Sequence, residues 1–182
     1  MKIIRNILLS SLVLVLPGMA HAAETNWVLE QSTLTYHVSH PLHHADGVSH
    51  AARGKGICQA GVCNFLAAVP VKTFDSGDTN RDLHMIEVVR GAQFPMVVVR
   101  TELPESDLKG GSVQVNLTVQ FAGQSAHYNN VPFKLVPEGK EIRVVGTIPT
   151  TVSDFKIKPP ELLAMPISNN IPVDVDMTWK EQ

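Results

Sequence analysis

Five histidines lie close together near the start of the chain, and they are the residues most able to bind a metal. They are His37, His40, His43, His44 and His50. Neutral imidazole is a common ligand of zinc, copper, nickel and haem iron. The spacing does not predict a ready-made site, because His37 and His40 would lie on opposite faces of one strand. We interpret the five as solvated loop histidines, with a metal- or haem-binding site as the alternative.

Only two cysteines occur, Cys58 and Cys63, with Gln-Ala-Gly-Val between them. In an oxidising compartment such a close pair predicts a disulfide, and Gly61 suits a tight turn that joins two strands. A zinc or redox site is less favoured, because the spacing is four residues and no second pair completes a tetrahedral site. Free thiols are the third alternative.

Residue patterns for enzymatic chemistry are missing from the sequence. It contains no Gly-x-Ser-x-Gly motif, and the cysteines are expected to be paired. Asp174 and Asp176 alternate with apolar residues, which places both carboxylates on the wet face of a strand rather than in a cleft. We therefore do not expect an enzyme.

Composition is that of a globular protein. The chain has 182 residues, of which 44% are hydrophobic and 18% charged, with 15 Lys and Arg against 17 Asp and Glu. Disorder would need fewer apolar residues and a larger net charge. The near balance of charge also argues against a basic nucleic-acid surface, so no nucleic acid is expected as a partner.

The first 22 residues have the three parts of a secretory signal peptide. Lys2 and Arg5 form a basic head, 7–16 is a mostly apolar run, and Ala20-His21-Ala22 supplies a cleavage site. The apolar run is too short to span a bilayer comfortably, and no later segment approaches the length of a membrane span. We expect residues 1–22 to be removed, leaving one domain at 23–182 in a bacterial periplasm or outside the cell.

Alternation of apolar and polar residues predicts a mainly antiparallel all-β domain. It is clearest over 113–121 and 173–180, and it recurs over 34–39. Turn signals separate about eight such runs. One helix is expected at 81–91 with Asn80 as its cap, and a further helical turn at 159–164. Eight strands can close as a barrel or stack as a sandwich, and alternation does not choose between them.

A set of motifs in fixed order is more specific. Asp75-Ser-Gly-Asp-Thr-Asn-Arg-Asp-Leu-His-Met85 is followed by Phe94-Pro95 and much later by Ser153-Asp-Phe-Lys-Ile157 and Pro159. This order resembles the YceI-like family, periplasmic polyisoprenoid-binding proteins. The resemblance implies an antiparallel lipocalin-like β-barrel of about eight strands with one short helix. Its apolar cavity would hold an isoprenoid lipid or a quinone-like amphiphile, with no other cofactor.

The resemblance also selects candidate ligand-binding residues. Arg81, Asp82 and His84 match the family motif; Arg81 or His84 could meet a polar head group, or the three could form a structural network that fixes the helix. Aromatic side chains could line the cavity or simply pack in the core. These aromatic candidates are Phe74, Phe94, Phe121, Phe133 and Phe155. The expected role is transport, storage or sequestration of a lipid by a monomer or a homodimer.

Overall fold

The computed structural model describes residues 24–182, so the predicted signal peptide lies outside the described residues. The fold is an all-β barrel of eight strands, as predicted. The eight strands are β1 (Thr25–His40), β3 (Arg53–Gln59), β4 (Val62–Pro70), β5 (Met96–Pro104), β6 (Ser112–Phe121), β7 (Gln124–Glu138), β8 (Glu141–Ile148) and β11 (Val173–Glu181).

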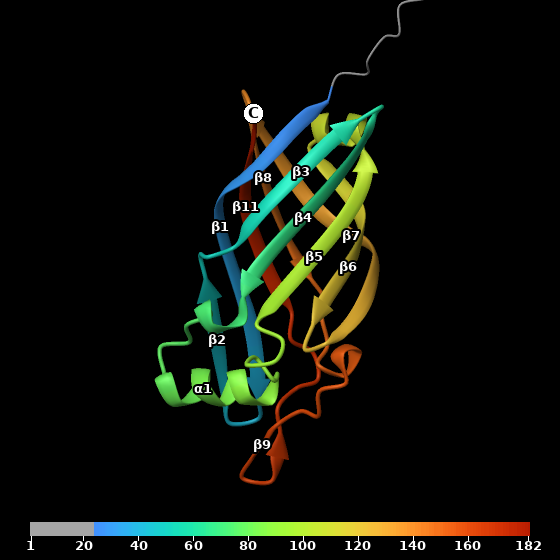
Figure 1. Ribbon diagram of the computed structural model, residues 1–182. Helices are drawn as coiled ribbons and strands as arrows, with labels where there is room; N and C mark the ends of the chain where they lie inside the picture. Colours follow the sequence, from blue (N-terminus) through green and yellow to red (C-terminus); the bar gives the residue numbers. More distant parts are fainter. Residues whose placement is uncertain (1–23) are drawn as a thin grey trace, which may run out of the picture.

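Antiparallel pairing runs around the whole barrel. Each strand from β3 to β8 pairs with the next, β8 pairs with β11, and β11 pairs with β1, which closes the barrel (Figure 1). The first residues of β1 pair with β3, whereas Leu34–His40 pair with β2 (His43–Ser49). The β1–β2 hairpin therefore extends the barrel wall beyond one end.

Sequence alternation correctly gave the inward faces. In β6, Val113, Val115 and Leu117 are buried, while Gln114 and Asn116 are exposed. Most other barrel strands also turn a set of apolar side chains inward, because leaving them in water would cost about 25 cal/mol per Å² of apolar surface. The barrel thus has a continuous apolar interior and a polar outer wall.

The helix begins earlier than predicted. α1 spans Thr79–Val88, and the side chain of Asp78 accepts a hydrogen bond from the Arg81 N–H at 3.0 Å. Asp78, not Asn80, is thus the N-cap. All ten residues of α1 are described and none is fully buried. The helix lies across one end of the barrel (Figure 1).

The segment predicted as a helical turn at 159–164 is instead a β-hairpin. It consists of β9 (Glu161–Leu162) and β10 (Met165–Pro166). Leu163 and Ala164 both have positive φ, 53° and 59°, the backbone of a tight hairpin turn. Residues 24–182 also form three short 3-10 helices: η1 (Val71–Thr73), η2 (Glu105–Lys109) and η3 (Ser153–Phe155).

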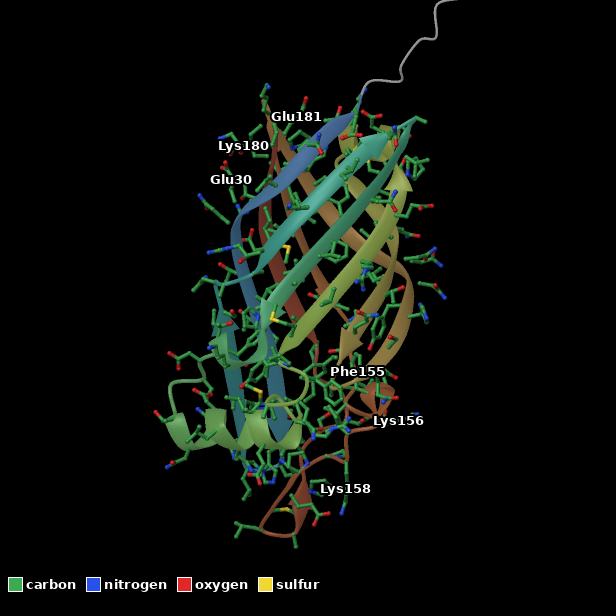
Figure 2. The ribbon with its side chains drawn as sticks, viewed as in Figure 1. Glu30, Phe155, Lys156, Lys158, Lys180 and Glu181 are labelled. Atoms are coloured by element: carbon green, nitrogen blue, oxygen red, sulfur yellow. A yellow bond between two sulfur atoms is a disulfide. The ribbon has the colours of Figure 1, made fainter. Side chains whose placement is uncertain are left out.

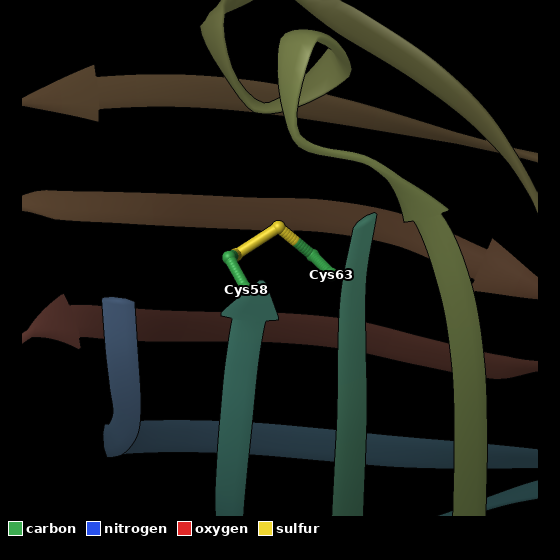
Figure 3. The surroundings of a disulfide bond; sticks show 2 residues. All are labelled: Cys58 and Cys63. Carbon is green, nitrogen blue, oxygen red and sulfur yellow. A yellow bond between two sulfur atoms is a disulfide. The ribbon is translucent and has the colours of Figure 1, made fainter. Parts of the chain in front are cut away.

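The disulfide is confirmed. Cys58 and Cys63 face each other across the β3–β4 turn and are bonded (Figure 3). Ala60 and Gly61 form that turn, with φ of 53° and 81°. Both cysteines are fully buried, so the bond fixes the hairpin from the inside of the barrel.

Candidate ligand-binding cavity

An elongated cavity of about 690 Å³ occupies the barrel interior. This volume is within the usual range for small-molecule sites, about 300–1,000 Å³. Nearly all of the lining is apolar, and every barrel strand except β3 contributes to it. The barrel is therefore not filled by its own side chains.

One end of the cavity is sealed by aromatic packing, and we call it the closed end. The ring centroids of Trp27 and Phe65 lie 6.3 Å apart, and those of Phe65 and Trp179 lie 5.0 Å apart with an edge-on arrangement. Both tryptophans are about 7% exposed. Space for these rings comes from Gly54 and Gly56 of β3, where an added Cβ would collide with Trp179 and Phe65 respectively.

The other end is the mouth, where α1, the β1–β2 turn and the β9–β10 hairpin lie (Figure 1). Here the cavity is lined by exposed polar residues. They are His43, Asp78, Asn80, His84 and Glu161. Because both tryptophans at the closed end are buried and these polar residues are exposed, we infer that the cavity opens at the mouth.

Four of the five predicted phenylalanines line the cavity. Phe74 and Phe121 are half-buried, Phe133 and Phe155 are buried, and Phe121 packs edge-on against Phe155 at 5.2 Å. Phe94 does not reach the cavity. Its ring lies close to Gly123, and the Arg90 guanidinium stacks over it at 5.0 Å.

The three motif residues of α1 are divided between two roles. Arg81 and His84 line the mouth, whereas Asp82 does not. Asp82 accepts hydrogen bonds from the Ser76 hydroxyl at 2.5 Å and the Ser76 N–H at 3.1 Å. Arg81 Nε in turn donates to the Ser76 hydroxyl oxygen at 2.8 Å and Nη2 to the Ser76 carbonyl at 2.7 Å. Ser76 thus fixes Arg81 at the cavity entrance.

Tyr36 is a cavity residue that the sequence reasoning did not select. It projects inward from β1 between Leu34 and Val38, and its ring lies 5.6 Å from Phe74. Burial raises the pKa of its hydroxyl, and the nearby Asp82 carboxylate raises it further. Alternation over 34–39 was the signal that could have found it. A neutral hydroxyl therefore stands inside the mouth, available to a polar ligand group.

The histidines do not gather into one cluster. His37 points outward, as the alternation predicted, and both ring nitrogens contact carboxylates, Asp46 at 2.8 Å and Asp174 at 3.0 Å. Since carboxylates only accept, this geometry fits a protonated ring. Asp46 and then Asp174 raise the pKa of His37 through these hydrogen bonds.

The other histidines have separate positions. His40 points inward, is 3% exposed, and lies with its ring centroid 5.1 Å from that of His43. His43 and His44 belong to β2 rather than to a loop, which corrects the prediction, because β1 continues to His40 and the turn is short. His50 contacts Thr33 on the outside at 3.1 Å. Within residues 24–182, no three His, Cys, Asp or Glu side chains are placed to hold a metal ion.

His40 links the mouth to the β9–β10 hairpin. Its Nδ1 accepts the Leu42 N–H at 3.2 Å, so Nε2 carries the proton and donates to the Met165 carbonyl, also at 3.2 Å. The Ser168 N–H donates to the Ser39 carbonyl at 2.7 Å nearby. These bonds hold the hairpin beside the end of β1.

No helix of residues 24–182 is both long and apolar enough to cross a membrane. No protein-family model matches the sequence, and no curated protein does so.

Solved structures, in contrast, share the fold. BcnA of Burkholderia cenocepacia superposes with a TM-score of 0.67 at 13% identity, covering 81% of this chain and 95% of that one. A polyisoprenoid binding domain from Saccharophagus degradans, implicated in plant cell wall breakdown, gives 0.67 at 15% identity, covering 86% and 98%. A YceI protein of Campylobacter jejuni gives 0.52 at 13% identity, covering 65% and 72%. The resemblance to YceI-like proteins is thereby confirmed at the level of the fold.

Proposed function

We propose that this chain, which has the fold of YceI-like proteins, binds a long apolar ligand in its barrel and performs no chemistry on it. The ligand is an isoprenoid lipid or a quinone-like amphiphile, and the role is transport, storage or sequestration in the periplasm. The observation that carries the proposal is the apolar cavity of about 690 Å³ that opens at one end.

Energetics favour a long chain over a short one. Each buried methylene contributes about 0.8 kcal/mol, so one five-carbon unit contributes about 4 kcal/mol before costs. Association itself costs about 4–15 kcal/mol. A single unit would barely offset this cost, whereas several units in an elongated cavity would bind tightly. The cavity therefore selects extended apolar molecules.

Polarity along the cavity gives the ligand a direction. The closed end presents Trp27 and Trp179, while the mouth presents Tyr36, Arg81 and His84. An apolar tail is most stable at the closed end, and a polar head finds hydrogen-bond partners at the mouth. In this pose Arg81, held by Ser76, has its Nη1 available for the head group.

Several observations support the remaining parts of the proposal. The Cys58–Cys63 disulfide and the signal-like residues 1–22 fit an oxidising, exported location. The similar structure from Saccharophagus degradans is a polyisoprenoid binding domain, which fits the ligand class.

Mass spectrometry of the purified protein tests the proposal. Native spectra and organic extracts should contain a co-purified lipid in the wild type. Ala67 is half-buried and lines the cavity, whereas its neighbour Leu66 is 37% exposed on the outer wall. Ala67→Phe should remove most of the bound lipid and Leu66→Phe should retain it. Equal lipid in both variants, or none in the wild type after expression with its signal sequence, would contradict the proposal.

A further inference from the structure

Three leucines are the most exposed large apolar side chains that the structure describes in residues 24–182. Leu42 and Leu83 are each 60% exposed and Leu163 is 74% exposed. The next most exposed are Ile57 at 46% and Val62 at 41%, both on the barrel wall. Single exposed apolar residues need no explanation, but a set confined to one place does.

All three leucines lie at the mouth. Leu42 is in the β1–β2 turn, Leu83 is on α1, and Leu163 is in the β9–β10 turn, three elements at the same end of the molecule (Figure 1). Each lies within two residues of a cavity-lining polar residue of its own element: His43, His84 and Glu161. We call Leu42, Leu83 and Leu163 the mouth leucines.

Local backbone keeps the mouth leucines away from the core. Met85 and Val88 line the cavity from one side of α1, and at 100° per residue Leu83 falls on the opposite side. Leu163 occupies a tight turn at φ 53°, a conformation unfavourable for a leucine. Its side chain lies exposed at the tip of the hairpin. No burial within this chain therefore offsets the unfavourable backbone conformation.

Charged residues of both signs surround the mouth, but acidic ones outnumber basic ones on α1 and in the loop before it. Over 75–88, Arg81 is accompanied by four carboxylates, those of Asp75, Asp78, Asp82 and Glu87. Lys156 and Lys158 precede the β9–β10 hairpin (Figure 2), and Lys158 Nζ lies 3.5 Å from Glu161. Among the described residues the mouth thus presents no basic surface that would attract anionic lipids, so its affinity for a bilayer must come from the leucines.

We propose that the mouth leucines insert into the surface of a lipid bilayer, so that the cavity opens directly onto the membrane. This inference rests on the proposed function, because a water-insoluble ligand must pass between an apolar phase and the cavity. A ring of apolar side chains around the opening shortens that passage through water. A protein partner is the other occupant to consider, but leucines placed around the opening of an apolar cavity favour the bilayer.

Flotation with phosphatidylcholine vesicles tests the proposal on the purified, lipid-loaded chain. The wild type should float with the vesicles, and adding phosphatidylglycerol should not increase the bound fraction. The triple variant Leu42→Ser, Leu83→Ser, Leu163→Ser should bind more weakly by about tenfold for each leucine removed. The matched control Ile57→Ser, Val62→Ser, Leu66→Ser removes the same number of exposed apolar residues from the barrel wall and should float like the wild type.

Two results would overturn membrane docking: no flotation of the wild type, or equal loss in the mouth and wall variants. Circular dichroism and thermal unfolding of both variants should show that each is folded, as expected for exposed positions.

Ala67→Phe separates membrane docking from ligand binding. It should float although its cavity is filled, and its failure to float would mean that the ligand, not the leucines, holds the vesicle. Absence of lipid in the wild type together with normal flotation would overturn the proposed function alone.

Discussion

The two ends of the barrel are formed by the same strands but packed in different ways. At the closed end, Trp27, Phe65 and Trp179 fill the interior, glycines of β3 make room for their rings, and a disulfide fixes the adjoining turn. At the mouth, α1 has no fully buried residue among those described, and polar groups surround an opening. This contrast predicts that the closed end contributes most to stability and that the mouth provides ligand access.

This division has a physical reason. A cavity costs stability, because its lining loses the dispersion contacts that a packed core would provide. The chain offsets that cost by dense packing at the closed end, where no ligand has to pass. Residues at the mouth remain free to interact with a ligand and its surroundings, as expected where function competes with packing.

Truncation at the closed end should have the largest effect. Trp179→Ala removes a buried ring that contacts Phe65 and limits the cavity. We expect a loss of about 3–5 kcal/mol in the free energy of unfolding, measured by urea denaturation. A loss below about 1 kcal/mol would mean that the closed end does not concentrate stability.

Overpacking the same region should have the next largest effect. In Gly54→Ala the new Cβ would lie 2.5 Å from Cη2 of Trp179, so the ring must move. The expected loss is about 1–3 kcal/mol in the free energy of unfolding. Gly111→Ala is the matched control, since an added Cβ there meets nothing within 4 Å. Equal effects of the two substitutions would disprove close packing around Trp179.

A substitution at the mouth should affect binding more than folding. Phe74 is half-buried, lines the cavity and contacts Tyr36. We expect Phe74→Ala to weaken binding of a long-chain isoprenoid by about tenfold, while the free energy of unfolding falls by about 1 kcal/mol. Titration calorimetry and denaturation, made on the same preparation, separate the two quantities. An effect as large as that of Trp179→Ala on folding would erase the contrast between the ends.

The smallest expected effect is on the pH dependence of stability, and it comes from a histidine bridge on the outer wall near the mouth. His37 bridges Asp46 of β2 and Asp174 of β11, and its pKa is raised in the folded state. Its contribution is therefore fully present below the pKa of an unfolded histidine and is lost as pH rises through the folded value. Because the ring is 36% exposed, solvent screening keeps this contribution below about 1 kcal/mol.

Asp174 sets the acid side of the same bridge. Its pKa is lowered by the hydrogen bond from Thr147 and then by that from His37, so its contribution is lost as pH falls through the folded value. Stability measured against pH should decline on both sides of this window. His37→Gln should flatten the alkaline decline, and an unchanged decline in that variant would show that the bridge does not contribute.

The sequence predicted some elements of the fold well and others poorly. Strict alternation in β6 and β11 defined their inward faces, because one face of each strand is buried over most of its length. The β9–β10 hairpin was not predictable, since Leu163 and Ala164 adopt positive φ without a glycine or asparagine. His43 and His44 were expected in a loop, but pairing with β1 makes them part of a strand.

The cavity itself was harder to predict than its wall. Phe121, Phe133 and Phe155 line the cavity, yet nothing in the sequence pattern distinguishes a filled barrel from a hollow one. Trp27 and Trp179 lie far apart in the sequence, and they pack against the same Phe65 ring because β1 pairs with β11. The glycines of β3 make room for these aromatic rings, and this role can be recognised only from the three-dimensional packing.

Tryptophan fluorescence tests the central claim most directly, because the chain has two tryptophans and both line the closed end of the cavity. Delipidated protein would be titrated with a long-chain isoprenoid that carries a bromine quencher at its tail. A tail buried at the closed end predicts strong quenching that saturates, that is absent in Ala67→Phe and that unlabelled isoprenoid reverses. Weak quenching that rises linearly without saturation, equally in wild type and Ala67→Phe, would contradict the claim that the barrel encloses an apolar ligand.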